Sequence, residues 1–255
     1  MLKIQQYIKA ESLQEAYEYL QKNRNNQIIA GMLWLKMEDR NIPVAIDLER
    51  LGLDEIIEDE EKFTIGANVT LRMLEQHERL NQAFHNVFKD SVKDIVGVQF
   101  RNLATIGGSV YSRFGFSDVI TALMCMHCDV VLYHQGSMDI ESFVNNDYQR
   151  DIITQIIVYK DQLPRAFVCM RKSATDISTL NLSVVKQADG YLFAVGARPQ
   201  KAMHYALAIE EEKETAKKLR SLVCCESNMR ASKEYREALV EALCQKALKK
   251  MEDLA

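Results

Sequence analysis

The chain of 255 residues contains only three prolines and ten glycines. So little of either residue excludes low-complexity linkers as a large part of the chain. Lysine and arginine number 32 against 36 acidic residues, which gives a formal net charge of −4. Because no long basic block is present, we expect neither nucleic acid nor an anionic membrane surface as a partner.

Long hydrophobic runs are also missing. Residues 1–6 lack the apolar centre of a signal peptide, and no apolar run is long enough to span a bilayer. We therefore expect a cytoplasmic protein that does not enter a membrane. The apolar content of 47% is ordinary for a globular protein, and the length allows one large domain or two to three small ones.

The six cysteines do not complete a metal-binding pattern. Cys125 and Cys128 have the spacing of a metal-binding pair, but no matching second pair follows them. A zinc or iron–sulfur site needs four converging ligands. The flanking residues are apolar, so we predict that Cys125 and Cys128 are buried, protonated core thiols that hold no metal. In a cytoplasmic protein the other four are expected to be reduced as well.

Local patterns divide the chain into three predicted domains. Residues 1–52 read as a small parallel α/β unit, in which Ser12 and Glu15 form a capping box at the start of a helix. Residues 53–145 read as a larger α+β unit, and residues 146–255 as a C-terminal α+β domain with a small antiparallel sheet. The acidic stretch 54–61 is interpreted as a solvated turn.

The strands and helices of these domains follow from apolar periodicity. Ala188-Asp189-Gly190 is a hairpin signal between two strands of the last domain. The predicted strands cover residues 3–8, 27–30, 44–48, 63–67, 130–133, 152–159, 166–171, 180–187 and 191–197. The predicted helices cover residues 13–20, 71–77, 80–88, 119–126, 212–223 and 233–251.

The most informative segment runs from Val98 to Val110. There an apolar Ala104-Thr105-Ile106 ends in Gly107-Gly108 and the small polar Ser109. Glycine lets the backbone approach a ligand closely, and successive free N–H groups at such a turn form a concave anion site. This chemistry suits a pyrophosphate. Local chemistry alone favours an ordinary strand turn punctuated by glycine.

With these residues the chain resembles the FAD-binding medium subunit of molybdenum hydroxylases, the group of xanthine dehydrogenase, carbon monoxide dehydrogenase and their relatives. That family carries Gly-x-x-x-Arg-Asn-x-Ala-Thr-Ile-Gly-Gly-Asn and then a Ser-Asp pair. Here Gly97, Arg101-Asn102, Ala104 to Gly108 and Ser117-Asp118 match it. The opening residues 1–50 and the C-terminal Ser232-Lys233-Glu234-Tyr235-Arg236 match as well, so the resemblance covers essentially the whole chain.

The resemblance implies FAD as the cofactor. Thr105, Gly107, Gly108 and Ser109 would cradle its pyrophosphate through N–H and hydroxyl donors, and Ile153 would pack against the flavin. Ser117 and Asp118 would bind polar groups of the cofactor, although Asp118 as the N-cap of a helix is a second interpretation. The complete set of implied cofactor-binding residues is Ala30, Gly31, Met32, Leu33, Trp34, Thr105, Ile106, Gly107, Gly108, Ser109, Tyr111, Ser112, Ser117, Asp118 and Ile153.

The chain departs from the family pattern at two places. Where the family has Ala-Gly-Gly-Thr-Asp-Leu, this sequence has Ala30-Gly31-Met32-Leu33-Trp34, so Met32 would contribute only its backbone N–H. Val168 stands where the family tends to carry a lysine near the flavin. Trp34 is either a core anchor or a neighbour of the cofactor. Arg101 either orders the glycine loop or is a surface charge.

The implied function is electron transfer within a multi-subunit oxidoreductase of the xanthine dehydrogenase type. Electrons would pass from iron–sulfur clusters through FAD to NAD or another acceptor, and no catalytic acid or base is expected in this chain. The expected partners are an iron–sulfur small subunit and a large molybdopterin-binding subunit in a heterotrimer. The alternatives are a scaffold subunit that has lost FAD and a stand-alone flavoprotein.

We expect FAD between the unit ending near residue 50 and the unit that follows it. The aromatic stretch Tyr111 to Phe116 either docks the iron–sulfur partner or belongs to the cofactor pocket.

Overall fold

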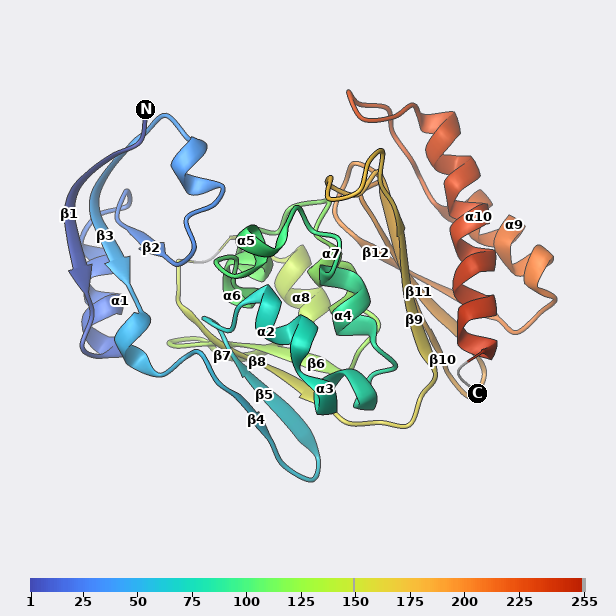
Figure 1. Ribbon diagram of the computed structural model, residues 1–255, viewed down its shortest axis with the longest axis horizontal. Coiled ribbons are helices and arrows are strands. Elements are labelled where there is room, and N and C mark those ends of the chain that lie inside the picture. Colours follow the sequence, from blue (N-terminus) through green and yellow to red (C-terminus); the bar gives the residue numbers. More distant parts are fainter. Residues whose placement is uncertain (149, 254–255) are drawn as a thin grey trace. The chain divides into compact units, whose positions relative to one another are not determined.

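The computed structural model describes residues 1–148 and 150–253. It is a mixed α+β structure, as the sequence predicts (Figure 1). The chain forms two compact units, each assembled from three segments. Unit 1 comprises Met1–Met73, Val98–Tyr111 and Cys128–Tyr159, and unit 2 comprises Leu74–Gly97, Ser112–His127 and Lys160–Ala255. The predicted division into three domains stays a prediction.

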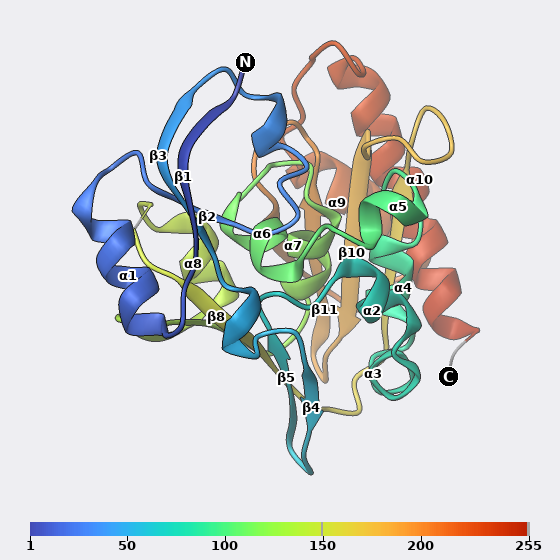
Figure 2. The same ribbon diagram turned by 60° about the vertical axis from the view of Figure 1, so that its left-hand side comes forward.

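Unit 1 begins with a three-stranded parallel sheet of order β1-β3-β2, visible in blue in Figure 2. The helix α1 (Leu13–Lys22) starts at Ser12, whose hydroxyl accepts the Glu15 N–H. The Glu15 carboxylate accepts the N–H of Glu11 rather than that of Ser12. Apolar residues of α1 pack on the end of β3 in one core cluster. The strands are β1 (Lys3–Lys9), β2 (Gln27–Ile29) and β3 (Asn41–Asp47).

The second sheet of unit 1 has five antiparallel strands in the order β4-β5-β8-β6-β7. The interpretation of residues 54–61 as a solvated turn is wrong in part, because Ile56 to Glu58 pair with β5. The strand β8, expected among the C-terminal strands, pairs with β5 and β6 instead. Apolar periodicity marks a strand but does not name its partner. The strands are β4 (Ile56–Glu58), β5 (Lys62–Gly66), β6 (Cys128–Leu132), β7 (Gly136–Asp139) and β8 (Ile153–Tyr159).

The glycine pair of the Val98–Val110 segment lies in a short helix, so its interpretation as a strand turn is wrong. This helix is α6 (Ile106–Tyr111), and Thr105 immediately precedes it. Short helices and turns complete unit 1: η1 (Leu35–Met37), η2 (Glu49–Leu51), α5 (Val98–Arg101) and α8 (Ile140–Asn145). The helix α2 (Leu71–Gln76) crosses the boundary between the units in the sequence.

Unit 2 is built on a four-stranded antiparallel sheet of order β12-β11-β10-β9. The predicted hairpin at residues 188–190 is confirmed, while the edge strand β12 (Met203–Ala208) was not expected. Two helices cover this sheet, and their apolar residues share one large core cluster with the strands (Figure 1). These elements are β9 (Arg165–Met170), β10 (Leu180–Lys186), β11 (Gly190–Gly196), α9 (Glu212–Leu222) and α10 (Lys233–Glu252).

The helix predicted over residues 80–88 is interrupted. It forms α3 (Glu78–Ala83) and α4 (Val87–Val92), separated by His85 and Asn86 with φ of 53° and 61°. Two consecutive left-handed residues cannot continue a right-handed helix. The helix α7 (Asp118–Leu123) follows in the same unit.

Arg236 in α10 explains the Ser-x-x-Tyr-Arg element of the C-terminal part. Its side chain is 1% exposed and donates to the carbonyl oxygens of Thr179, Ala197, Glu226 and Ala231. Distances run from 2.7 to 3.1 Å. One guanidinium thus satisfies main-chain acceptors of several loops of unit 2.

The prediction that Cys125 and Cys128 are buried is confirmed, since each is 2% exposed. Burial raises the pKa of Cys125 to about 12 and also raises the pKa of Cys128. Among residues 1–148 and 150–253, no group of three or more His, Cys, Asp or Glu side chains is arranged to hold a metal. No helix in that part of the chain is long and apolar enough to cross a bilayer.

Candidate functional site

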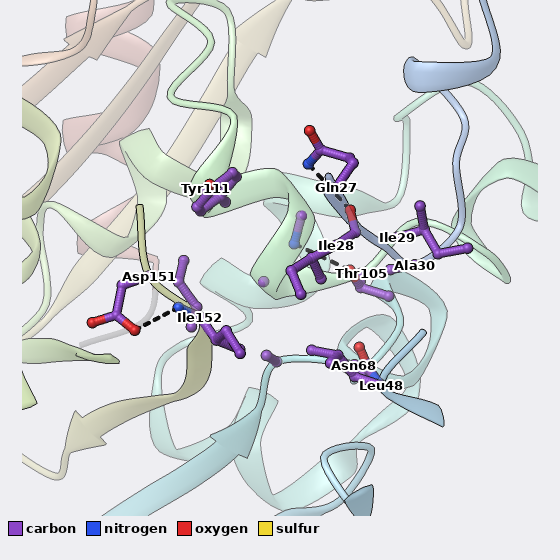
Figure 3. Close-up of a pocket in the computed structure, with 14 residues that line it drawn as sticks. Gln27, Ile28, Ile29, Ala30, Leu48, Asn68, Thr105, Tyr111, Asp151 and Ile152 are labelled. Carbon is purple, nitrogen blue, oxygen red and sulfur yellow. Dashed lines mark hydrogen bonds between the residues drawn. The ribbon is translucent and has the colours of Figure 1, made fainter. Parts of the chain in front are cut away.

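Unit 1 contains a pocket, and all of its lining residues belong to that unit (Figure 3). Most of the lining is apolar, and a few polar side chains converge on it, which is the usual composition of a small-molecule site. The lining residues are Gln27, Ile28, Ile29, Ala30, Leu48, Ala67, Asn68, Thr105, Gly107, Gly108, Tyr111, Asp151, Ile152 and Ile153.

Strand ends position much of this lining. Ala30 follows β2, Leu48 follows the neighbouring parallel strand β3, and Ala67 follows β5. Ligands of parallel α/β sheets bind outside the carboxyl ends of the strands, because side chains from successive loops converge there. The pocket therefore lies where residues 1–50 and the second sheet of unit 1 meet.

Three polar side chains of the pocket retain hydrogen-bonding capacity. The Thr105 hydroxyl accepts the Gly108 N–H at 3.1 Å, and its own hydrogen has no acceptor within the described chain. Among the described residues, the Asn68 side-chain amide and the Tyr111 hydroxyl have no hydrogen-bond partner. These groups are available to a ligand.

The two adjacent glycines serve different purposes. A Cβ on Gly107 would lie 2.6 Å from the Ala67 carbonyl oxygen, so close backbone packing requires glycine there. A Cβ on Gly108 would meet only the Thr105 hydroxyl oxygen, at 3.1 Å. Gly108 lines the pocket, so its missing side chain leaves room for a ligand rather than for the protein itself. Gly31 resembles Gly107, because its Cβ would lie 2.1 Å from the Leu103 carbonyl oxygen.

The expected row of free N–H groups at Gly107 and Gly108 is absent. Gly107 donates to the Ala67 carbonyl at 2.9 Å, Gly108 to the Thr105 hydroxyl, and Ser109 to the Thr105 carbonyl at 3.0 Å. These three N–H groups of the first turn of α6 therefore already have acceptors within the protein. The sequence pattern shows the glycines, but the acceptor of the Gly107 N–H comes from Ala67, forty residues earlier in the chain.

Free N–H groups occur instead in the turn after β2. Within the described residues, the main-chain N–H groups of Gly31, Met32 and Leu33 have no acceptor. Met32 has a φ of 55°, a left-handed conformation that glycine adopts more readily. The backbone path suited to a second glycine is therefore retained although the side chain is methionine. Met32 packs against the cluster of Ile29, Ile42 and Ala45.

The structure brings six of the predicted cofactor-binding residues onto the pocket: Ala30, Thr105, Gly107, Gly108, Tyr111 and Ile153. Gly31, Met32, Leu33 and Trp34 continue from Ala30 without lining it. Ile106 is fully buried, and the Ser109 hydroxyl donates to the Thr105 carbonyl at 2.8 Å. Trp34 is partly buried, with its ring edge-on to Phe100. Arg101 is buried, so its interpretation as a surface charge is wrong.

Ser112, Ser117 and Asp118 belong to unit 2. Ser117 is the N-cap of α7, and its hydroxyl accepts the Ile120 N–H at 3.2 Å. The interpretation of Asp118 as that N-cap is therefore wrong. The Asp118 carboxylate is buried and accepts from Ser178 and Asn181, both at 2.6 Å, and from Arg171 at 2.7 Å. Burial raises the pKa of Asp118, and these donors oppose that shift.

Sequence reasoning missed Asn68 and Asp151 on the pocket. Both lie next to predicted strands, and a search for polar residues at strand ends finds them. Asp151 is 1% exposed, and its carboxylate accepts the N–H groups of His134, Gln135 and Ile152. In Figure 3 this carboxylate points away from Thr105, toward the Ile152 N–H, so it shapes the wall rather than facing a ligand.

Comparison with known proteins gives a consistent result. Residues 2–166 match the family model described as FAD binding domain in molybdopterin dehydrogenase. The glyceraldehyde dehydrogenase medium chain of Sulfolobus acidocaldarius is 25% identical over an alignment of 284 positions, which covers 96% of this chain and 97% of that protein.

Solved structures share the fold over nearly the whole length. Carbon monoxide dehydrogenase from Hydrogenophaga pseudoflava gives a TM-score of 0.86 at 19% identity and covers 97% of each chain. Quinoline 2-oxidoreductase from Pseudomonas putida 86 gives 0.84 at 18% identity, again over 97% of each chain.

The site fits the cofactor of this family. Gly108 leaves open space on the pocket, Thr105 offers a free hydroxyl hydrogen, and the turn after β2 offers free N–H groups. The match covers more than half of the chain and confirms the resemblance and the assignment of FAD. The chain belongs to the family of FAD-binding domains of molybdopterin dehydrogenases and is an oxidoreductase subunit.

Proposed function

We propose that this chain is the FAD-carrying electron-transfer subunit of a heterotrimeric molybdopterin hydroxylase. Electrons from a large molybdopterin subunit would reach it through an iron–sulfur small subunit and leave to NAD or another acceptor. The observation that carries this proposal is the pocket face of Gly108, where the protein's own packing does not require glycine. A scaffold that had lost FAD would have no reason to keep that space.

When bound, FAD supplies the redox chemistry, and the residues of this chain bind and orient it. The N–H groups of Gly31, Met32 and Leu33 and the Thr105 hydroxyl would hold phosphate oxygens. Ile153 and the other apolar residues of the pocket would exclude water from the cofactor. No catalytic acid or base is assigned to this chain.

The substrate of the complete enzyme is proposed to be selected by the large subunit. The similar proteins are named for glyceraldehyde, carbon monoxide and quinoline, which have little chemistry in common. That diversity around one subunit type supports a substrate site on another chain. A xanthine dehydrogenase type of activity is one member of this range.

The first test is cofactor binding by the full-length chain. Purified protein should show flavin absorbance, and after removal of flavin it should quench the fluorescence of added FAD at a one-to-one ratio. A folded chain that neither retains nor rebinds FAD would support the scaffold alternative. Co-purification with an iron–sulfur chain and a molybdopterin chain tests the heterotrimer, and isolation of an active single chain would refute it.

The aromatic stretch at residues 111–116 remains our proposed docking element for the iron–sulfur subunit. Phe114 and Phe116 stack with ring centroids 5.0 Å apart, and Phe114 is 37% exposed. Exposed aromatic residues are enriched in interface cores. Replacing Arg113 and Phe114 by alanine should weaken complex assembly more than flavin content. Normal assembly with loss of flavin would assign the stretch to the cofactor site instead.

A further inference from the structure

Arg150 makes an unusually large number of contacts with the main chain of unit 1. Its guanidinium donates to the carbonyl oxygens of Leu20, Asn23, Arg24 and Asn26, at distances of 2.6 to 2.9 Å. Its own carbonyl oxygen accepts from the Gln21 side chain at 2.8 Å. The acceptors are the last turn of α1 and the loop after it, where helical carbonyls lack partners of their own.

The loop that Arg150 holds leads directly into one wall of the pocket. Asn26 is 3% exposed, donates to the Tyr19 carbonyl at 2.6 Å and accepts the Val44 N–H at 3.1 Å. Residues 27–30 follow immediately and line the pocket. The carbonyl contacts of Arg150 therefore fix the place at which this wall begins.

The opposite wall follows Arg150 itself. Asp151, Ile152 and Ile153 line the pocket. The Asp151 carboxylate is held by the N–H groups of His134 and Gln135, at 3.2 and 3.0 Å, and the Ile152 carbonyl accepts the Tyr133 N–H at 2.9 Å. This wall is thus anchored to the β6–β7 turn on one side and, through Arg150, to the α1–β2 loop on the other.

We infer that Arg150 is a positioning residue for FAD: it sets the separation of the two pocket walls without contributing to the lining. The inference rests on the proposed FAD function of this pocket. A positive charge at the end of α1 would by itself stabilise the helix. Only the planar fork of arginine can donate to four carbonyls at once, and a lysine ammonium has three donors on a single nitrogen.

The test uses the full-length apoprotein and FAD titration followed by flavin fluorescence, with the visible circular dichroism of the bound flavin as a second readout. Arg150→Gln should raise the FAD dissociation constant by about tenfold, because a loosened site loses preorganisation. Arg150→Gln should also alter the flavin dichroism. Arg150→Lys should give an FAD dissociation constant between those of the unchanged chain and Arg150→Gln. Arg24→Gln is the matched control. It removes a charge from the same loop but leaves the main-chain carbonyls that Arg150 contacts, so it should bind FAD as the unchanged chain does.

Hydrogen exchange separates positioning from simple helix capping. In Arg150→Gln the amides of both walls, residues 27–30 and 151–153, should exchange faster. Unchanged FAD affinity and dichroism in a folded Arg150→Gln chain, or full rescue by lysine, would overturn the inference. If Arg150→Gln does not fold, Gln21→Ala removes only the contact to the Arg150 carbonyl and should weaken FAD binding in the same direction. Wild-type affinity in that variant would then refute the positioning role. Failure of the unchanged chain to bind FAD would instead refute the proposed function.

Discussion

Each unit of this chain contains an arginine that donates to several main-chain carbonyls, and the two arginines have different roles. In unit 1 Arg150 donates to four main-chain carbonyls, and in unit 2 Arg236 does the same. Arg236 is 1% exposed, while Arg150 lies beside the pocket and is only partly buried. Arg236 joins buried segments of unit 2, whereas Arg150 borders the proposed binding site of unit 1.

The units also differ in how their polar groups are satisfied. In unit 2 the Asp118 carboxylate is fully engaged by Arg171, Ser178 and Asn181. In unit 1, within the described residues, the N–H groups of Gly31 to Leu33 and the Thr105 hydroxyl hydrogen have no acceptor. Thr105 is buried and lines the pocket, and buried polar groups are normally paired, so its unused hydroxyl hydrogen is available to a ligand. We therefore expect substitutions in unit 2 to lower mainly stability, and substitutions at the pocket of unit 1 to weaken the proposed binding of FAD.

The largest expected effect is on Arg236. Arg236→Leu would leave the carbonyls of Thr179, Ala197, Glu226 and Ala231 without their donor, and the free energy of unfolding should fall by about 3 kcal/mol or more. Urea denaturation measures this loss. FAD affinity of the folded protein should stay unchanged. Normal stability with weakened FAD binding in this variant would contradict the stabilising role of Arg236.

The adjacent glycines give a sharper contrast inside unit 1. Gly107→Ala should cost about 1–3 kcal/mol of stability, because its Cβ overlaps the Ala67 backbone. Gly108→Val should leave the fold intact and weaken FAD binding by about 10- to 200-fold, the usual effect of extra methyl-sized groups in a pocket. Thermal unfolding measures the stability of both variants, and FAD titration measures their affinity for the cofactor. The assignment fails if Gly108→Val retains its full flavin content.

The buried thiol of unit 2 should limit alkaline stability. The pKa of Cys125 is raised from 9.0 to about 12 by burial, so its contribution is complete below pH 9 and is lost as the pH rises toward 12. At pH 10 the loss should be about 1 kcal/mol. Urea denaturation at pH 8 and pH 10 should show a smaller difference for Cys125→Ala. The exposed Cys224 supplies the control, and an equal effect of Cys224→Ala would contradict the assignment.

The smallest effect is expected at Met32. Met32→Gly relieves a left-handed backbone but removes apolar packing, so stability should change by less than about 1 kcal/mol. FAD affinity should be retained, because the proposed contact uses only the main chain. A large loss of affinity would show that the Met32 side chain itself takes part in binding.

Much of the local structure could be predicted from the sequence. The Ser12 cap, the hairpin at residues 188–190 and the long helix α10 each depend on residues close together in the chain. The motif from Gly97 to Asp118 was specific enough to indicate the family and its cofactor. The long-range contacts could not be predicted: the partners of β8 and the Ala67 acceptor for the Gly107 N–H group.

The sequence by itself therefore determined many of the elements, the family and the cofactor, because capping, periodicity and a contiguous motif are properties of neighbouring residues. Only the tertiary structure decided which glycine faces the pocket and which is packed against Ala67, since their flanking sequence is shared. It also decided that Asp118 is consumed by a buried network and that Arg150 joins two pocket walls. Those roles depend on partners 53 to 130 residues away, whose approach no local pattern encodes.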